Sequence, residues 1–269
     1  MQRNLKIYWE YTKVGFRQRM IYRSAFFLGI IGQWIGYGAT YASMYIMVTS
    51  FGTLDGWNAS EIMFLYGFST LSYSLGASFF FNPCIHLSQK IRTGLFDQSL
   101  TKPISPFFHE MCQEGFNSGY VSHVTLAIVI MTFALENLRY NLTWTSVFLM
   151  LPMLIGAALI QAASLIAASS ASFFFVNENP VMRFLLFEIK QFTNYPITIF
   201  PRPIEILLTF ILPFAFINFY PAALFFSKNL PEGFPMRLPY LTPVIGVMVF
   251  LLSILLWNQG LKHYKSSGS

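Results

Sequence analysis

Charge is the first thing that this sequence lacks. Only 10% of its 269 residues are Asp, Glu, Lys or Arg, against roughly 25% in an ordinary soluble domain. A soluble chain of this length needs a charged surface around its core, and this composition cannot provide one. Hydrophobic residues make up 55% and aromatic residues 18%, so lipid is the expected solvent for most of the chain.

Cysteine and the common catalytic motifs are scarce as well. Cys84 and Cys112 are the two cysteines, and with the four histidines they form no metal-ligand pattern. Cys84 with His86 supplies two ligands, which is too few for a metal site. The phosphate loop GxxxxGK[ST], the HExxH zinc motif and the GxSxG nucleophile elbow do not occur. We therefore expect no metal site, no catalytic residue and no ATP hydrolysis by this chain.

Long apolar runs, by contrast, are abundant. A helix needs about 20 apolar residues to cross a bilayer. Six segments approach or exceed this length, namely residues 24–49, 61–83, 118–135, 144–176, 203–226 and 240–261, of which the third is short and the fourth is longer than needed. The expected fold class is therefore an all-α polytopic membrane protein with six transmembrane helices, in which residues 1–269 form a single transmembrane domain.

The distribution of Lys and Arg predicts how these spans are oriented, because basic residues stay preferentially in the cytoplasm. With both termini inside, the inner segments hold fourteen of the seventeen basic residues. The outer loops hold the other three, which are Arg139, Lys228 and Arg237. Both termini and the polar connection over residues 84–117 are therefore expected on the cytoplasmic side.

The first 23 residues predict an amphipathic helix in the headgroup layer. Its charged residues recur at spacings of three and four, which places them on one stripe of a helix: Arg3, Lys6, Glu10, Lys13 and Arg17. Trp9 lies on a neighbouring apolar face, and this combination is typical of an interfacial helix. The alternative is an ordinary positively charged flank that happens to be helical.

Small residues and prolines mark special positions inside the spans. Gly32 and Gly36 lie four apart and predict a close helix contact, within this bundle or with a second subunit. In the fifth segment, prolines predict breaks in the helix. The candidates for a kinked wall of a substrate path are Pro213, Phe214, Phe216, Tyr220 and Pro221. The alternative is a structural kink that touches no substrate.

One titratable residue, His123, falls clearly within a predicted span. Such a group is the sign of a proton- or ion-coupled carrier, although a lone histidine more often forms hydrogen bonds between helices. A secondary transporter that acts alone is therefore kept as an alternative function.

The connection over residues 84–117 predicts a docking element. Ile85, Leu87, Ile91 and Leu95 give an apolar helical pattern, so a short amphipathic helix should end near Gly94. A turn with an apolar edge is then expected, formed by Leu100, Pro103, Ile104 and Pro106. Energy supplied by a partner protein would enter through such a cytoplasmic element.

Two stretches resemble the signature regions of ABC transporter permeases in the type-2 exporter class. The first is "KIRTGLFDQSLTKPIS", where the family pattern is matched by Gly94, Asp97, Leu100, Lys102, Pro103, Ile104 and Ser105. The second is "NYPITIFPRPIEILLTFILPFAFINFYPA", matched by Tyr195, Pro196, Ile197, Ile199, Phe200, Pro201, Pro213, Phe214, Phe216, Tyr220 and Pro221. Six spans and an amphipathic N-terminus agree with this family, so the resemblance extends over nearly the whole chain.

The resemblance implies a permease that is not itself an enzyme. It would pair with a second permease, identical or related, and with two ATPase subunits that hold ATP and Mg. Its ATPase-coupling residues would be Ile91, Arg92, Gly94, Leu95, Asp97, Leu100, Lys102, Pro103 and Ile104. Membrane lipid is the further expected partner, nucleic acid is not, and the expected location is the plasma (inner) membrane. The cargo would be amphiphilic, lipid-like, a drug or a glycan.

Overall fold

The structure is a computed structural model that describes residues 2–113, 116–141, 143–175 and 179–266, with side chains except at residues 2–5, 51 and 187. Within these ranges the chain forms helices and no β-strand, apart from one isolated bridge between Leu54 and Trp57. The predicted all-α class is therefore confirmed.

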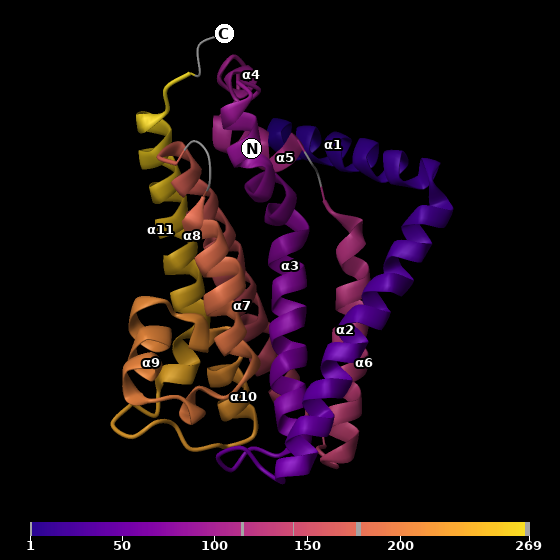
Figure 1. Cartoon of the computed structure of the whole chain (residues 1–269), viewed down its shortest axis with the longest axis vertical. Coiled ribbons are helices and arrows are strands. Elements are labelled where there is room, and N and C mark those ends of the chain that lie inside the picture. The colour runs from indigo at the N-terminus through magenta and orange to yellow at the C-terminus, as the bar shows by residue number, and fades with distance from the viewer. Residues whose placement is uncertain (1, 114–115, 142, 176–178, 267–269) are drawn as a thin grey trace.

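The N-terminal helix lies across one end of the molecule. Helix α1 (Gln2–Ile21) runs crosswise to the bundle, and the chain turns at Tyr22 into α2 (Arg23–Phe51), which slants along its edge (Figure 1). Trp34 of α2 donates to the Ser122 carbonyl oxygen at 3.0 Å, and Tyr41 donates to Thr70 at 3.0 Å. Helix α1 thus coincides with the predicted interfacial helix over residues 1–23, while its contact with lipid stays a prediction.

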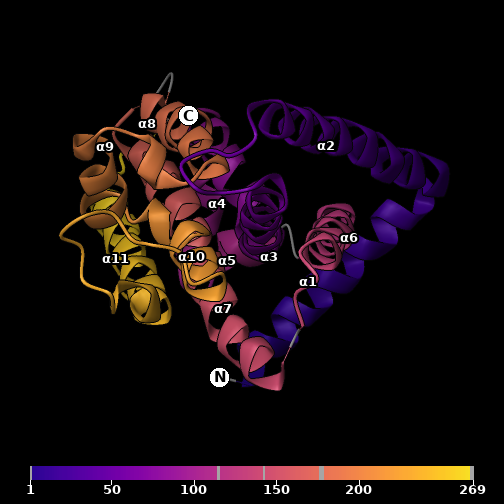
Figure 2. The same ribbon diagram turned by 90° about the horizontal axis from the view of Figure 1, so that it is seen from below.

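Helix α3 (Ala59–Arg92) is the centre of the bundle. Its first turn is capped by Asn58, whose side chain accepts from the Glu61 amide while the Glu61 carboxylate accepts from the Asn58 amide. Figure 2 shows α3 between α6 (Val121–Asn137) and α7 (Trp144–Ser170). Gly67 and Gly76 allow these two neighbours to approach, because a Cβ at either position would lie 2.7 Å from the facing helix.

The last helix, α11 (Thr242–His263), packs along α7. It follows a 3-10 turn, η8 (Leu238–Leu241), and returns to the end that also holds the N-terminus (Figure 1). Gly156 of α7 and Gly246 of α11 meet backbone to backbone at the crossing. The absence of side chains at this point therefore sets the closest approach of the two helices.

The predicted fifth span over residues 203–226 is not one helix. It consists of α9 (Arg202–Ile206), η6 (Leu207–Ile211), η7 (Phe214–Phe216) and α10 (Phe219–Phe225). Leu212 leaves the helical conformation because proline disfavours it in the preceding residue, and Pro213 then ends the helix instead of kinking it. Pro221 lies in the first turn of α10, where proline is tolerated.

The chain reaches this region through an earlier segment. The orange ribbon of Figure 1 runs from α8 (Pro180–Arg183) through η3 (Phe184–Glu188) and η4 (Ile189–Asn194) toward the end opposite the termini. Beyond η5 (Ile197–Ile199), Arg202 lies at that opposite end, with its guanidinium 4.1 Å from the Phe234 ring centroid. The prediction grouped Arg202 with the termini, whereas the structure places it toward the other end of the bundle, because the descent starts before the long apolar run.

Three helices are long and apolar enough to cross a membrane, judged by length and composition over the described residues. They are Ser118–Asn137, which includes η1 (Ser118–Tyr120), Trp144–Phe173, which includes η2 (Ala171–Phe173), and Leu238–His263. Helices α2 and α3 have the length, but their Gly, Ser, Thr and Tyr residues lower the mean hydropathy. An all-α membrane protein is thus supported, and six spans stay a prediction.

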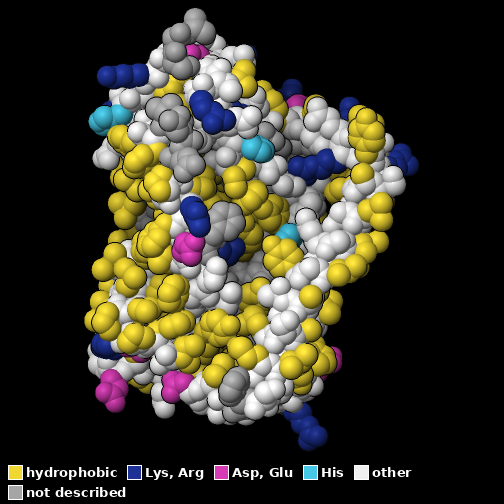
Figure 3. Space-filling view, viewed as in Figure 1, with side chains coloured by type: hydrophobic (Ala, Val, Ile, Leu, Met, Phe, Trp, Pro, Cys, Tyr) yellow, Lys and Arg dark blue, Asp and Glu magenta, His cyan; other side chains and the backbone are white. Residues whose placement is uncertain are grey.

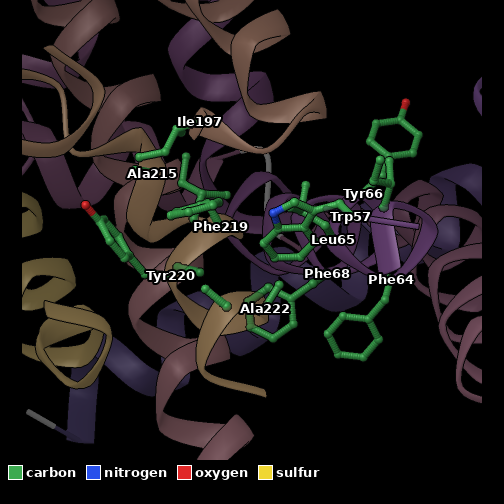
Figure 4. Packing of buried hydrophobic residues seen from close by; sticks show 14 of the residues in the cluster. Trp57, Phe64, Leu65, Tyr66, Phe68, Ile197, Ala215, Phe219, Tyr220 and Ala222 are labelled. Carbon is green, nitrogen blue, oxygen red and sulfur yellow. The ribbon is translucent and has the colours of Figure 1, made fainter. Parts of the chain in front are cut away.

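Aromatic residues form the core at the end opposite the termini. Figure 4 shows Trp57, which lies just before α3, beside Phe219 of α10. The ring centroids of Trp57 and Phe219 are 5.8 Å apart, and Phe64 stacks on Phe225 at 5.0 Å. This packing fixes the broken fifth segment against α3.

Candidate functional site

The predicted coupling loop forms the tip of the molecule at the end that holds both termini. Helix α3 continues to Arg92, and the chain reverses at Gly94, whose φ of 73° favours glycine. The short helix α4 (Asp97–Leu100) follows and protrudes at the top of Figure 1. The predicted stop near Gly94 is correct, but the amphipathic helix before it is part of α3 and not a separate element.

A buried polar network holds the tip to the bundle. Lys90 of α3 lies 2.9 Å from a carboxylate oxygen of Glu110, whose side chain is 1% exposed. The Ser99 hydroxyl of α4 donates to the other oxygen of that carboxylate, and Nδ1 of His109 lies 3.1 Å from the same hydroxyl. Glu110 and His109 belong to α5 (Pro106–Gln113), so the network ties three helices together. Burial lowers the pKa of His109, which keeps the imidazole neutral beside the ion pair.

The C-terminal segment, through Tyr264 and Ser266, contacts the tip from the other side. The Asp97 carboxylate accepts hydrogen bonds from Ser266 at 2.6 Å and from the Tyr264 hydroxyl at 2.8 Å. These two donors hold the pKa of Asp97 below its ordinary value. The fully buried Phe96 packs edge-on against Tyr264 at 5.0 Å and Phe173 at 5.5 Å. The tip is therefore a rigid element with fixed contacts on two sides.

The predicted coupling residues divide by exposure around this element. Ile91 is buried, and Gly94, Asp97 and Ile104 are partly buried. The outward surface consists of Arg92, Leu95, Leu100, Lys102 and Pro103. Leu95 is 52% and Leu100 44% exposed. Apolar side chains beside two cations suit a protein partner, because packing supplies affinity and charge supplies orientation. We call residues 91–105 the coupling segment.

The predicted interfacial residues lie on α1, apart from the coupling segment. Trp9 is 59% exposed, and Lys13 forms an ion pair with Glu10 at 2.9 Å. Lys6 and Arg17 are exposed, and the side chain of Arg3 lies outside the described residues. On the opposite face, Tyr8 stacks on Phe79 of α3 at 6.3 Å. Helix α1 therefore presents charge and tryptophan away from the bundle.

The five kink candidates lie at the other end of the molecule. Phe214, Phe216, Tyr220 and Pro221 are buried, and Pro213 is partly buried. Tyr220 forms a hydrogen bond with Thr209 at 3.0 Å. Pro213 and Phe216 border a cavity of about 400 Å³ beside α11. Contact with a substrate stays a prediction for these residues.

Four supporting residues of the coupling segment were not predicted. Lys90, Ser99 and Glu110 form its buried network, and Tyr264 holds Asp97 from far along the sequence. The sequence holds one signal for this network: Glu110 is a single acid within the apolar stretch "PFFHEMC", and an acid that is buried there needs a cation as its partner. Nothing in the sequence points from Asp97 to Tyr264.

Replacing Tyr264 by phenylalanine is expected to loosen α4 without unfolding the bundle. The ring packing remains, whereas Asp97 loses one of its two donors. Amide hydrogen exchange over residues 95–101 should become roughly fivefold faster, as expected for one lost hydrogen bond.

In the wild type, exchange over the same residues should also become faster as the pH falls below about 4. Protonation of Asp97 removes the negative charge that the two hydroxyl groups stabilise.

Tyr240→Phe is the matched control, since Tyr240 is 55% exposed at the opposite end. Equal exchange in the wild type and Tyr264→Phe would show that the C-terminal contact does not fix α4.

Comparison with known protein families identifies the family to which this chain belongs. A family model described as ABC-2 family transporter protein matches residues 35–268, a range that includes the coupling segment and the broken fifth segment. No curated protein and no solved structure matches the chain. Membrane subunits of this family work with ABC ATPase subunits in general. The chain therefore belongs to the ABC-2 family of transporter proteins.

Proposed function

We propose that this permease is the transmembrane subunit of an ATP-driven exporter. It pairs with a second permease and binds two ATPase subunits through its coupling segment, and the ATPases hold ATP and Mg. The cargo is amphiphilic, in the range of lipids, drugs and glycans. Family membership supports the permease assignment, and the observation that carries the rest is a rigidly held tip with an exposed apolar surface.

The geometry of α3 supports transmission of force from this tip. Its 34 residues run without interruption from the aromatic core to the coupling segment, a length of about 50 Å. Gly67 brings the Met131 side chain of α6 directly against it, and Gly76 brings the backbone of α7 directly against it. A displacement of the tip therefore moves three helices together, because close-packed interfaces shift as units.

The charge distribution supports a cytoplasmic position for the tip. Of the seventeen basic residues, twelve belong to segments at the end with both termini, four (Arg139, Arg202, Lys228 and Arg237) belong to segments at the opposite end, and Lys190 lies between them. That bias favours both termini inside and the plasma membrane as location. Helix α1 then lies in the inner headgroup layer, with Trp9 and its charged stripe toward lipid.

The outer face of α2 supports a second permease. A Cβ at Gly32 or Gly36 would meet no heavy atom within 4 Å, and the same holds at Gly29. The predicted contact face of Gly32 and Gly36 is therefore uncovered among the described residues. Ile31 and Ile35 nearby are 49% and 68% exposed. A glycine face flanked by isoleucine allows close approach of another helix in lipid.

Reconstitution tests the proposed function. Co-expressed with the ATPases of its host, the chain should retain an ATPase through purification, and efflux of amphiphilic dyes from liposomes should require ATP. Transport by the purified chain alone, driven by an ion or proton gradient, would instead establish the secondary-transporter alternative. His123 gives that alternative no support, because its ring is used in packing, 4.4 Å from the Tyr37 ring and hydrogen-bonded to Ser122.

A further inference from the structure

Two neighbouring cavities lie beside α2 and α3: one is closed by the descending segment of residues 184–194, and the other by residues 117–123 at the start of α6. One of about 240 Å³ is bordered by Tyr37, Tyr73, Lys190 and Asn194, and the other of about 300 Å³ by Tyr37, Tyr73, Asn117 and His123. Tyr37 and Tyr73 border both, so the two cavities lie on either side of these rings. Figure 3 shows this face of the molecule hollowed between the bundle and the α2 arm.

Lys190 places a positive charge in the first of these cavities. Its ammonium lies 3.1 Å from the centroid of the Tyr73 ring. Tyr73 follows the start of α3 by 14 residues, or about 21 Å along the axis, and a bilayer core is about 30 Å thick. A lysine at this depth usually extends to the interface or pairs with an acid. Here no carboxylate of the described residues forms an ion pair with it.

The remaining walls consist of neutral hydrogen-bonding groups. Tyrosine and serine hydroxyls line the two cavities with the amides of Gln33, Gln191 and Asn194, and neither cavity is bordered by Asp or Glu among the described residues. An isolated cation surrounded by neutral donors is costly to maintain in lipid unless it has an anionic counterpart. Phosphates and carboxylates accept bonds from such donors.

We propose that the first cavity, which Lys190 borders, binds the anionic group of the cargo, a phosphate or carboxylate, with this lysine as its counter-charge. The tyrosine rings flank that group, and the open side of the cavity leaves room for an attached apolar tail. The assignment rests on the proposed transport function, and it narrows the cargo to anionic amphiphiles or the corresponding free anions.

Equilibrium binding to the purified full chain in neutral detergent tests the site. The probes are dioctanoyl phosphatidylglycerol, inorganic phosphate and dioctanoylglycerol, which lacks the phosphate, and the readout is the saturable rise in Tm. We expect phosphatidylglycerol to stabilise the wild type and dioctanoylglycerol to have no effect. Lys190→Met should raise the apparent Kd at least about tenfold, because a charge-assisted contact is lost, whereas Lys190→Arg should stay within about threefold.

Arg183→Gln is the matched control for loss of one positive charge. Arg183 is exposed, lies three residues before the cavity-lining Leu186 and pairs with Glu188 at 3.7 Å. The variant should bind like the wild type. Should Lys190→Met fail to fold, Asn194→Ala removes one wall amide and should weaken binding about fivefold. If inorganic phosphate raises the Tm, a free anion is a ligand of the site. If phosphatidylglycerol raises the Tm and inorganic phosphate does not, the ligand is an anionic amphiphile.

Wild-type affinity in Lys190→Met, equal weakening in Arg183→Gln, or equal binding of dioctanoylglycerol would overturn the proposal. The measurement needs neither ATP nor an ATPase. A failure of the proposed ATP coupling would therefore leave the binding result unchanged, and the two failures can be told apart.

Discussion

Gly246→Val is expected to prevent the docking of α11 on α7 and so to destabilise the permease by more than about 3 kcal/mol. A Cβ at Gly246 would overlap the Gly156 carbonyl oxygen and lie 2.6 Å from the Gly156 Cα. Both are backbone atoms, so no rotamer change relieves the overlap. In lipid, close packing is a main force between helices, and separating them forfeits it along the whole contact.

The measurement is the Tm of the detergent-purified chain, together with its yield in the membrane. Gly36→Val is the matched control, because a Cβ there meets nothing within 4 Å, and the isolated chain should keep the wild-type Tm. The reciprocal change Gly156→Val should resemble Gly246→Val, since its Cβ would lie 2.6 Å from the Thr242 carbonyl oxygen. An unchanged Tm in either would mean that the glycine crossing is absent in the folded permease.

The glycine crossing also shows how far the sequence predicts this fold. Apolar runs correctly located α7 and α11, because hydropathy depends on local composition alone. The partner of each glycine depends on which helices meet, and that is a property of the whole bundle. The spacing of Gly32 and Gly36 predicts a close helix contact. The tight contact in the structure is instead formed by Gly156 and Gly246, which lie 90 residues apart in the sequence.

The fifth segment shows a different limit of prediction from the sequence. Pro213 and Pro221 correctly signalled a departure from a plain helix, but the apolar run around them was read as one span. The chain instead descends from Pro180, in a stretch whose Arg183, Glu188 and Lys190 looked like a loop. A window of hydropathy cannot recognise a charged residue that is accommodated by a tyrosine ring from another helix.

The coupling segment was predicted more fully than any other part. Its polarity, its turn at Gly94 and its exposed leucines follow from local sequence. Its rigidity does not, because the buried Glu110 and the clasp by Tyr264 join residues from three separate stretches. The sequence therefore identifies the surface, and the structure identifies what holds the surface in place.

Leu95→Asp combined with Leu100→Asp is expected to abolish stable ATPase binding while the permease stays folded. Both side chains point to solvent, 52% and 44% exposed, so the bundle loses no packing. Burial of each leucine by a partner is worth about 1.5–3 kcal/mol, and loss of two should weaken association at least about 100-fold. ATPase retention during purification and ATP-dependent dye efflux measure the effect.

The conservative pair Leu95→Met with Leu100→Met should keep ATPase binding, because volume and apolarity are preserved. The comparison separates docking from folding, since the Asp and Met pairs occupy the same exposed positions and should share one Tm. If the Asp pair keeps its ATPase, docking does not depend on these leucines, and the force that drives transport must enter α3 elsewhere. If it loses both the ATPase and the efflux at an unchanged Tm, the exposed tip is where ATP energy reaches the helices.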